Sequence, residues 1–329
     1  MNKNFFNNKA VLITGGTGSF GQKFTEVLLK EYNPKKIIIF SRDELKQFEM
    51  ANTFSNFKNK LRFFIGDVRD LPRLKLAFRD ISIVIHAAAL KQVPTAEYNP
   101  FETVKTNIIG TQNVIDAVID SRVEKLISLS TDKAAAPINL YGATKLAGDK
   151  LVVAANNFSD KSFSVVRYGN VWGSRGSIIP EILKQKKSGL ILLTDKRMTR
   201  FSITLDYGVK FVLKCLFKMK GSEIFVPKIP SYQLIDLARA LAPDARIKYI
   251  GIRPGEKLHE EMITKSDSLN TLEFKDYFII LPSQFSKWSK KDFIKKFEKY
   301  KGKACKENFS YNSFDNYYLS QKEIRRFSY

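Results

Sequence analysis

Short apolar runs alternate with longer amphipathic stretches along the first half of the chain. Runs rich in β-branched residues predict strands, at Ala10–Thr14, Lys36–Phe40, Leu61–Ile65, Ile83–His86, Lys125–Ser128 and Phe163–Arg167. The stretches between them predict helices, at Phe20–Glu31, Asp43–Phe54, Leu71–Phe78, Pro100–Asp120 and Tyr141–Asn156. Continuously apolar strands that alternate with helices indicate an α/β fold with a doubly wound parallel sheet of the Rossmann type.

The pattern becomes less regular after about Gly176. It predicts helices at Ile179–Lys187, Tyr207–Lys218 and Tyr232–Ala240, and strands at Glu223–Val226 and Tyr277–Leu281. We therefore predict a dinucleotide-binding domain that carries the catalytic residues (1–175), a smaller α/β substrate-binding lobe (176–282) and a basic, aromatic C-terminal extension (283–329).

The composition mainly excludes certain classes of protein and of site. The 329 residues are 44% hydrophobic, as in an ordinary globular protein. No apolar run approaches the roughly 20 residues that cross a bilayer, and the first apolar run leads into a glycine loop instead of a signal-peptide cleavage site. The two cysteines are far apart, so neither a disulfide framework nor a cysteine metal site is indicated. We expect a cytoplasmic protein without a metal centre.

Part of the net charge of +22 comes from the segment between Lys287 and Lys306. This segment contains nine lysines and two carboxylates, so its own net charge is +7. Aromatic and apolar residues recur there at helical spacing, at Phe293, Ile294, Phe297 and Tyr300. We interpret the segment as a solvated helix that packs its aromatic stripe on the body. Weak contact with an anionic membrane surface is the alternative. No known nucleic-acid-binding module accompanies the charge, so nucleic acid is not the expected partner.

A glycine-rich loop lies directly between the first predicted strand and the first predicted helix, with Gly15, Gly18 and Gly21 in a G-x-x-G-x-x-G pattern. Glycines there permit a tight turn and close approach of the backbone to a pyrophosphate, which the helix N-terminus also attracts. Because the strand and helix supply the required context, the pattern predicts a dinucleotide-binding loop and not a simple turn. Its cofactor-binding residues are Gly15, Thr17, Gly18, Ser19, Phe20 and Gly21.

The residues after the second strand favour NADP. NAD-preferring sites place an acidic residue there for the ribose hydroxyls, whereas this chain has Ser41 and Arg42. A guanidinium is suited to a 2′-phosphate. The segment nominated for the cofactor is Ser41, Arg42, Asp43, Glu44, Leu45 and Lys46, and Asp67 and Val68 after the third strand are expected to meet the adenine.

Tyr141 and Lys145 form a Y-x-x-x-K motif at the start of a predicted helix, which places both on one face. A nearby ammonium favours the phenolate and is expected to lower the tyrosine pKa, so that Tyr141 can take a hydroxyl proton. Behind a glycine loop at this distance, the motif predicts catalysis in place of a surface pair.

A second acid–base pair follows the fifth strand, at Asp132 and Lys133, after Ser130 and Thr131, either of which could hold a substrate hydroxyl. A simple alcohol oxidation does not need this pair. A lysine with a lowered pKa can take a proton from carbon beside a carbonyl, and a carboxylic acid can protonate a leaving hydroxyl. On chemistry alone, an ordinary salt-bridged turn explains the pair nearly as well.

These motifs together resemble one family of extended short-chain dehydrogenases/reductases, the inverting UDP-N-acetylglucosamine 4,6-dehydratases that begin the pathway to pseudaminic acid, a flagellin-modifying sugar. The similarity extends from about Val11 to Pro282 and is carried by Thr14–Gly21, Ser41–Lys46, Ile65–Asp70, His86–Pro94, Ser130–Lys145, Arg167–Pro180, Arg197–Phe201 and Ile252–Glu260. Retaining dehydratases resemble the chain less, since they carry Asp-Glu in place of Asp132-Lys133.

The resemblance implies three chemical steps. Tyr141, helped by Lys145, deprotonates the C4 hydroxyl as hydride passes to NADP. Lys133 then removes the C5 proton while Asp132 assists the loss of the C6 hydroxyl as water, with Thr131 as a further catalytic residue. Hydride returns to C6, and C5 is reprotonated on the opposite face. The net reaction is that of a lyase.

The same resemblance implies a UDP-sugar site and a homo-oligomer, a dimer or a hexamer. Its expected residues are Ala87, Lys91, Asn170, Ser174, Arg175, Thr194, Arg200, Arg253 and Glu256, and Lys91 is also expected to contact the cofactor. The chain departs from the family pattern at Gln92, Ala136 and Ser202, where histidine, asparagine and tryptophan are expected. Other readings remain open: a retaining dehydratase or a 4-epimerase, and, in another class, a non-catalytic NADP-binding module.

Overall fold

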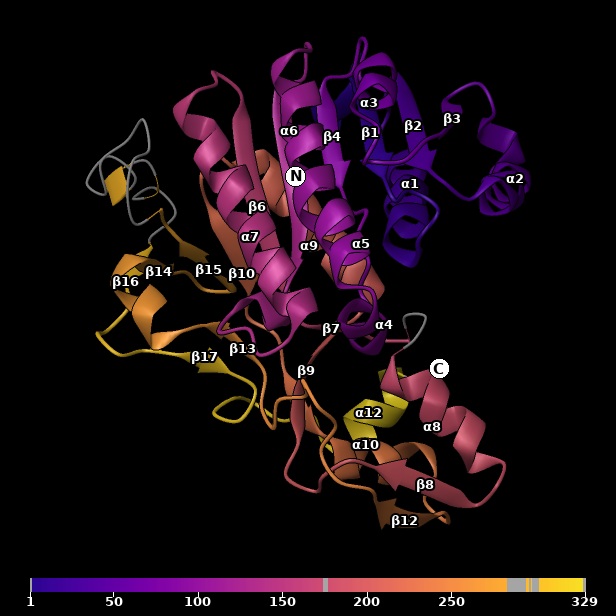
Figure 1. The fold of residues 1–329 in the computed structure, drawn as a ribbon, viewed down its shortest axis with the longest axis vertical. Helices are drawn as coiled ribbons and strands as arrows, with labels where there is room; N and C mark the ends of the chain where they lie inside the picture. The colour runs from indigo at the N-terminus through magenta and orange to yellow at the C-terminus, as the bar shows by residue number, and fades with distance from the viewer. Residues whose placement is uncertain (1, 174–176, 283–293, 296, 298–301, 328–329) are drawn as a thin grey trace.

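We describe the protein from a computed structural model. The structure describes residues 2–173, 177–282, 294–295, 297 and 302–327. Two hydrophobic cores organise these residues, a large one around a central sheet and a smaller one in a lobe below it (Figure 1).

The central sheet is ten-stranded within the described ranges, in the order β16-β14-β15-β10-β6-β5-β4-β1-β2-β3. The strands from β3 to β10 in that order are all parallel, and β15, β14 and β16 continue the sheet antiparallel. Their bounds are β1 Ala10–Thr14, β2 Lys36–Ser41, β3 Leu61–Ile65, β4 Ile83–His86, β5 Lys125–Thr131, β6 Ser162–Tyr168, β10 Ile224–Pro227, β14 Thr271–Glu273, β15 Tyr277–Ile280 and β16 Lys303–Ala304.

Helices cover both faces of this sheet, with α6 and α7 in front of the strands and α9 behind them in Figure 1. On one face α6 packs against both α3 and α7, whereas α1 packs against α9. The bounds are α1 Ser19–Glu31, α2 Glu44–Thr53, α3 Leu71–Ala77, α4 Val93–Tyr98, α5 Pro100–Val104, α6 Gly110–Ile119, α7 Leu140–Ala154 and α9 Leu205–Lys218. The predicted doubly wound α/β fold is confirmed.

Two predicted helices differ from the structure. The stretch Pro100–Asp120 is not one α-helix, because a π-helical segment, Lys105–Ile109, separates α5 from α6. The predicted helix Tyr232–Ala240 begins later, since Ser231–Gln233 forms strand β11 before α10 starts at Leu234. Tyr232 is apolar enough to continue the helical pattern, but its buried ring belongs to the smaller core instead.

Outside the central sheet, the described residues form three small sheets, of which one is the antiparallel pair β13–β17, and the lobe also contains three helices. Its parallel pair β8–β12 packs with α8, α10 and α12 around the smaller core. A second sheet, β11-β9-β7, connects it to the central domain. The bounds are β7 Asn170–Val171, α8 Ile178–Lys186, β8 Leu190–Leu193, β9 Thr199–Ile203, β11 Ser231–Gln233, α10 Leu234–Leu241, β12 Arg246–Tyr249, β13 Glu261–Ile263, β17 Tyr311–Asn312 and α12 Gln321–Phe327.

The division between sheet and lobe does not follow a single cut at residue 176. Strand β10 pairs with β6 and with β15, so these parts of the predicted lobe extend the central sheet. An apolar run predicts a strand but not which sheet it joins, because the pairing partner is distant in sequence.

The last described residues are also part of the fold and not a separate extension. Strand β17 pairs with β13, and Leu319 and Ile324 are buried in the smaller core. Most of the lysine-rich segment, including Phe293 and Tyr300, lies outside the described residues. No helix that the structure describes is long and apolar enough to cross a membrane.

Candidate active site

A cavity of about 810 Å³ lies at the carboxyl ends of the parallel strands and continues into the lobe. Its wall contains Gly15 after β1, Ser41 at the end of β2, Ala87 after β4 and Thr131 at the end of β5. The opposite wall comes from the lobe and includes Arg200. Ligands of doubly wound folds bind at this edge, and the volume suits a large ligand.

The glycine loop leaves no room for a side chain at Gly15 or at Gly21. Gly15 has φ +65°, and a Cβ on it would lie 2.9 Å from Ala88 Cα. A Cβ on Gly21 would lie 2.3 Å from the Gly16 carbonyl oxygen. Gly18 precedes α1 as its N-cap, so the first backbone N–H groups of the helix border the cavity. This cradle fits the pyrophosphate of a dinucleotide.

The residues expected at the adenosine end are brought together, with two exceptions. Ser41, Arg42, Asp43, Lys46, Asp67 and Val68 line the cavity, whereas Glu44 and Leu45 do not. Arg42 is half-exposed, and its Nη1 lies 3.4 Å from Asp67 Oδ2. Asp43 caps α2 by accepting a hydrogen bond from the Lys46 backbone N–H. Gln47, which the sequence analysis did not nominate, donates to the Ser41 hydroxyl at 3.0 Å.

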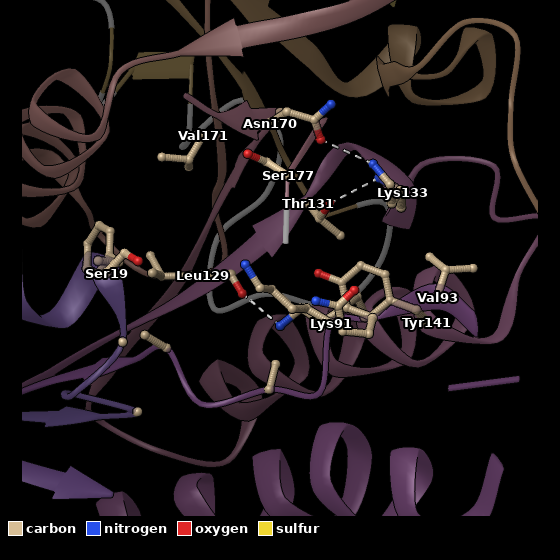
Figure 2. A pocket seen from close by; sticks show the side chains of 18 of the residues that line it. Ser19, Lys91, Val93, Leu129, Thr131, Lys133, Tyr141, Asn170, Val171 and Ser177 are labelled. Carbon is tan, nitrogen blue, oxygen red and sulfur yellow. Dashed lines mark hydrogen bonds between the residues drawn. The ribbon is translucent and has the colours of Figure 1, made fainter. Parts of the chain in front are cut away.

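Strand β5 and helix α7 position the candidate catalytic side chains. Strand β5 ends at Thr131, whose hydroxyl donates to Asp132 Oδ1 at 3.0 Å. Tyr141 lies in the first turn of α7, which Asn139 caps by accepting from the Gly142 N–H. Figure 2 shows Thr131, Lys133 and Tyr141 around the same part of the cavity, with Asn170 facing Lys133. The structure therefore brings together residues that the sequence nominated from separate segments.

Lys145 is buried below Tyr141 in α7, and its ammonium donates to the Leu129 carbonyl oxygen at 2.7 Å. Burial lowers the pKa of Lys145, although the Asp149 carboxylate opposes this. The Tyr141 pKa differs from the expected direction, because burial raises it to about 12, while the Lys133 charge and a side-chain hydrogen bond with Thr131 act against burial. The Tyr141 phenol is therefore neutral at neutral pH. A positive charge within the cavity would favour its phenolate.

Lys133 also differs from the expectation of a lowered pKa. Its ammonium lies 3.1 Å from Asp132 Oδ1 and 3.1 Å from Glu260 Oε1. Burial alone would lower the pKa of Lys133, but these two carboxylates outweigh burial and raise it. Lys133 is therefore a protonated ammonium here, and it becomes a base only after it gives that proton away.

Asp132 is fully buried behind Lys133 and does not line the cavity. Burial raises the pKa of its carboxyl group, against the effect of the Lys133 ammonium. Its Oδ2 has no hydrogen-bond partner among the described residues. A Cβ on Gly169, which does line the cavity, would lie 3.3 Å from this oxygen. The missing side chain at Gly169 therefore keeps the Asp132 carboxyl close to the cavity.

Glu260 is a residue that the sequence analysis missed as a site residue. It lines the cavity, is buried, and lies 3.7 Å from Arg200 Nε as well as beside Lys133. The available signal was its place at the end of the motif Ile252–Glu260, before an apolar strand. Sequence alone did not show that this carboxylate faces Lys133.

The expected substrate residues that are described all line the cavity: Ala87, Lys91, Asn170, Thr194, Arg200, Arg253 and Glu256. Ser174 and Arg175 lie outside the described residues. Arg200 Nη2 lies 4.0 Å from Glu256 Oε1, and Asn139 donates to the Gly255 carbonyl oxygen at 2.8 Å. This second contact connects the lobe directly to the N-terminus of α7. The part of the chain that the structure describes contains no cluster of three or more metal-ligating His, Cys, Asp or Glu side chains.

Comparison with known proteins identifies the family of the chain. The family model described as polysaccharide biosynthesis protein matches residues 11–282. The chain belongs to this family. Its matched residues agree with the span over which the motifs resemble the inverting dehydratases.

Two relatives of the chain carry different names. A Campylobacter jejuni protein named UDP-N-acetylglucosamine 4,6-dehydratase (inverting) is 56% identical over 325 residues, 97% of each chain. A Rickettsia rickettsii protein named UDP-glucose 4-epimerase is 41% identical over 286 residues, 84% of this chain and 83% of the other. The first relative confirms the resemblance to inverting dehydratases that the motifs indicated.

Solved structures agree in fold. The X-ray structure of Pen from Bacillus thuringiensis has a TM-score of 0.87 and 38% identity, and the match covers 98% of this chain and 97% of Pen. The dTDP-glucose 4,6-dehydratase DesIV from Streptomyces venezuelae, solved with NAD and TYD bound, has a TM-score of 0.69 at 20% identity and supports the fold alone.

Proposed function

We propose that the protein is a UDP-N-acetylglucosamine 4,6-dehydratase that inverts C5 and forms UDP-2-acetamido-2,6-dideoxy-β-L-arabino-hex-4-ulose. The observation that carries the proposal is the 3.1 Å contact between Asp132 Oδ1, which is buried, and Lys133 Nζ, which lines the cavity together with Tyr141. A hydroxyl oxidation needs Tyr141 and Lys145, whereas loss of water needs a further base and acid. The 56% identical relative with this name supports the same assignment.

We propose NADP as the cofactor, held by the glycine loop and the Ser41–Lys46 segment. When bound, it would accept a hydride from C4 of the sugar and return one to C6. The Arg42 guanidinium, half-exposed at the end of the cavity, supports a contact with a 2′-phosphate.

The protein's own residues then have distinct proposed roles. Tyr141 takes the C4 hydroxyl proton, and the buried Lys145 ammonium stabilises the phenolate. The resulting C4 ketone acidifies the C5 proton, which Lys133 removes as a neutral amine. Asp132, whose pKa burial raises, supplies the proton with which the C6 hydroxyl leaves as water. Reprotonation of C5 on the opposite face produces the inversion.

The remaining substrate contacts are proposed from the lobe and from the ends of the strands. Arg200 and Arg253 are suited to the diphosphate, and Glu256 to a ribose hydroxyl. Ala87, Lys91, Asn170 and Thr194 complete the wall against which the sugar would lie. The product is a precursor suited to pseudaminic acid or a related surface sugar.

The decisive experiment is NMR of UDP-N-acetylglucosamine incubated with the protein in D2O. We expect a 4-keto, 6-deoxy product with deuterium at C5 and the L-arabino configuration. Retention of the D-xylo configuration would contradict the inversion. Replacement of Lys133 by methionine is expected to abolish elimination and to leave NADP binding intact.

The same spectra test a 4-epimerase, which the names of the Rickettsia relatives suggest as the second candidate. An epimerase uses Tyr141 and Lys145 but has no role for the Asp132–Lys133 pair. It would return a 4-epimer without loss of water. A protein that binds NADP but changes no UDP-sugar would instead be a non-catalytic module.

A further inference from the structure

Lys133 lies between two buried carboxylates that come from different parts of the chain. Asp132 precedes it in sequence, whereas Glu260 precedes strand β13 in the lobe. Each carboxylate has one oxygen 3.1 Å from Lys133 Nζ, and the side chains of Asp132 and Glu260 are 0% and 3% exposed. The other oxygen of each has no hydrogen-bond partner among the described residues. Two carboxylates therefore compete for the proton of a single ammonium.

The C-terminal part of the chain holds Glu260 in this position. The Glu260 backbone N–H donates to the Ser313 hydroxyl at 2.9 Å, and the Ser313 N–H donates to the Glu260 carbonyl oxygen at 2.7 Å. The Thr199 and Ser313 hydroxyl oxygens lie 2.7 Å apart. These contacts come from β9 and from the residue after β17, so the tertiary fold fixes the backbone from which the carboxylate projects.

Further charged and titratable groups lie near the cluster. Arg200 Nε lies 3.7 Å from Glu260 Oε1, and Glu256 lies behind Arg200. Lys257 adds a positive charge that acts on Glu260 and Asp132. The Lys133 charge also acts to lower the pKa of the Tyr141 and Tyr232 phenols, against burial, which raises both. The positive charges of Lys133 and Arg200 balance the two carboxylates of Asp132 and Glu260.

The elimination step requires a definite number of protons in this cluster. The Lys133 amine takes the C5 proton, the C5–H electron pair forms the C5–C6 double bond, and the C6–O bond breaks. A carboxylic acid of the cluster gives its proton to the departing hydroxyl, which leaves as water. The step ends with an ammonium and a carboxylate, and one proton that returns from nitrogen to oxygen restores the starting pair. No proton is exchanged with solvent in this half of the reaction.

On the basis of the proposed dehydratase function, we propose that Glu260 is a positioning residue that holds Lys133 opposite Asp132 and retains the shared proton of the elimination step within the cluster. The two equal 3.1 Å contacts carry this inference. Glu260 lines the cavity whereas Asp132 does not, so the second carboxylate also lies on the side from which substrate approaches.

The elimination needs one proton shared between Asp132 and Lys133. A negative charge beside this pair raises the pKa for the loss of that proton. That loss leaves an amine without an acid, so it produces the basic limb of the pH–rate profile. Removal of the Glu260 charge therefore shifts this limb to lower pH. Because a neighbouring charge changes a pKa by about 1–3 units, we expect Glu260→Gln to shift the basic limb of kcat by at least about one unit.

The experiment measures kcat and KM for UDP-N-acetylglucosamine from pH 6 to 10, together with deuterium incorporation at C5 in D2O. Glu260→Gln is expected to lower kcat about tenfold at pH values on the basic limb of the wild-type profile, with a smaller change in KM and with NADP binding retained. Glu260→Asp keeps the charge, so its basic limb is expected at the wild-type position even if the shorter side chain lowers kcat. Glu261→Gln, a neighbouring acid that does not line the cavity, is the matched control and keeps the wild-type profile.

A folded Glu260→Gln protein with an unshifted basic limb would overturn the proposal, as would an equal shift in Glu261→Gln. If Glu260→Gln does not fold, Glu260→Asp decides, because a displaced basic limb in that variant contradicts a role of the charge. The wild-type reaction separates this result from the proposed function. Absence of the 4-keto, 6-deoxy product in the wild type refutes the function, whereas product formation with an unshifted variant refutes only the role of Glu260.

Discussion

Arg42 lies half-exposed at the end of β2, with its Nη1 3.4 Å from Asp67 Oδ2. This weak contact leaves the guanidinium available for a bidentate contact with a 2′-phosphate. At the scale of single residues, Arg42 therefore carries the proposed preference for NADP.

We expect Arg42→Ala to weaken NADP binding at least about tenfold and to change NAD binding little, because only NADP has the additional phosphate. Titration of each cofactor by protein fluorescence measures both constants. Arg62→Ala, which removes another exposed arginine outside the cavity, is the control. Equal weakening of both cofactors would remove the basis for preferring NADP.

Ala136 shows what a departure from the family pattern does to the backbone. Its φ of +42° lies in the left-handed region, where asparagine is tolerated better than alanine. Asparagine is also the residue that the family resemblance leads us to expect there. The strain lies four residues after Asp132 and five before Tyr141.

We expect Ala136→Asn to stabilise the protein by about 0.5–1 kcal/mol, because it relieves left-handed strain in the folded state. Chemical denaturation measures this as a higher midpoint with an unchanged slope. Ala134→Asn, at a buried position outside the left-handed region, is expected to destabilise. A lower midpoint for Ala136→Asn would contradict the explanation from strain.

At the scale of secondary-structure elements, the buried His86 connects β1, β4 and α6. Its Nδ1 lies 2.7 Å from the Thr14 hydroxyl oxygen and its Nε2 lies 3.1 Å from the Thr111 hydroxyl oxygen. Thr14 also accepts hydrogen bonds from the Ala87 and Ala88 N–H groups, which border the cavity. Burial, with a smaller effect of the Lys145 charge, lowers the pKa of His86 to about 3.

This lowered pKa predicts acid-sensitive stability. The unfolded chain binds the proton near pH 6.5, whereas the folded protein binds it only near 3, so the stabilisation is complete above 6.5 and decreases as the pH falls towards 3. Between pH 7.5 and 5.0 we expect a loss of about 2 kcal/mol in the free energy of unfolding. Urea denaturation at both pH values measures it, over a range in which ordinary carboxylates stay ionised.

His86→Gln should remove most of this difference, even if it lowers stability at both pH values. His259→Gln changes the other histidine, which is only partly buried, and is expected to retain most of the difference. A pH dependence that remains in His86→Gln would assign the effect to another group.

Like His86, the π-helical segment between α5 and α6 connects parts of the fold that border the cavity. It contains Asn107, which accepts from the Leu90 N–H, donates to the Leu90 carbonyl oxygen, and donates to the Thr144 hydroxyl. Thr144 immediately precedes Lys145. The segment thus connects the loop after β4 with the helix that carries the Y-x-x-x-K motif, and π-helical insertions are common at functional sites.

At the scale of the whole molecule, the C-terminal segment completes the lobe. Ile324 in α12 is fully buried against α10 in the smaller core, and Ser313 holds the backbone of Glu260. The integrity of the substrate side of the cavity therefore depends on residues that are more than fifty positions away in sequence.

We expect Ile324→Ala to destabilise the lobe by about 2–4 kcal/mol, because it leaves a cavity in a small core. The KM for UDP-N-acetylglucosamine should increase several-fold, whereas the NADP dissociation constant should stay unchanged. Steady-state kinetics and cofactor titration measure the two effects separately. Lys322→Ala, on the exposed face of the same helix, serves as the control. An equal loss of cofactor affinity would show that the two cores do not respond independently.

The sequence alone determined the six parallel strands of the first half and the glycine loop that follows the first of them, since both depend on local patterns. Strands such as Ala10–Thr14 and Ile83–His86 have the predicted bounds, because continuous apolar runs between turn residues are typical of buried parallel strands. The resemblance to the family, carried by ordered motifs, also required no structure.

Only the tertiary structure decided the charge state of Lys133 and the extent of the lobe. The expected lowered pKa of Lys133 was wrong because Glu260, 127 positions later in the chain, faces the same ammonium as Asp132. Strand β10 joins the central sheet, and α12 joins the smaller core, for the same physical reason. Local patterns report which residues are buried, but pairing partners and the electric field at a buried group depend on which distant segments the fold brings into contact.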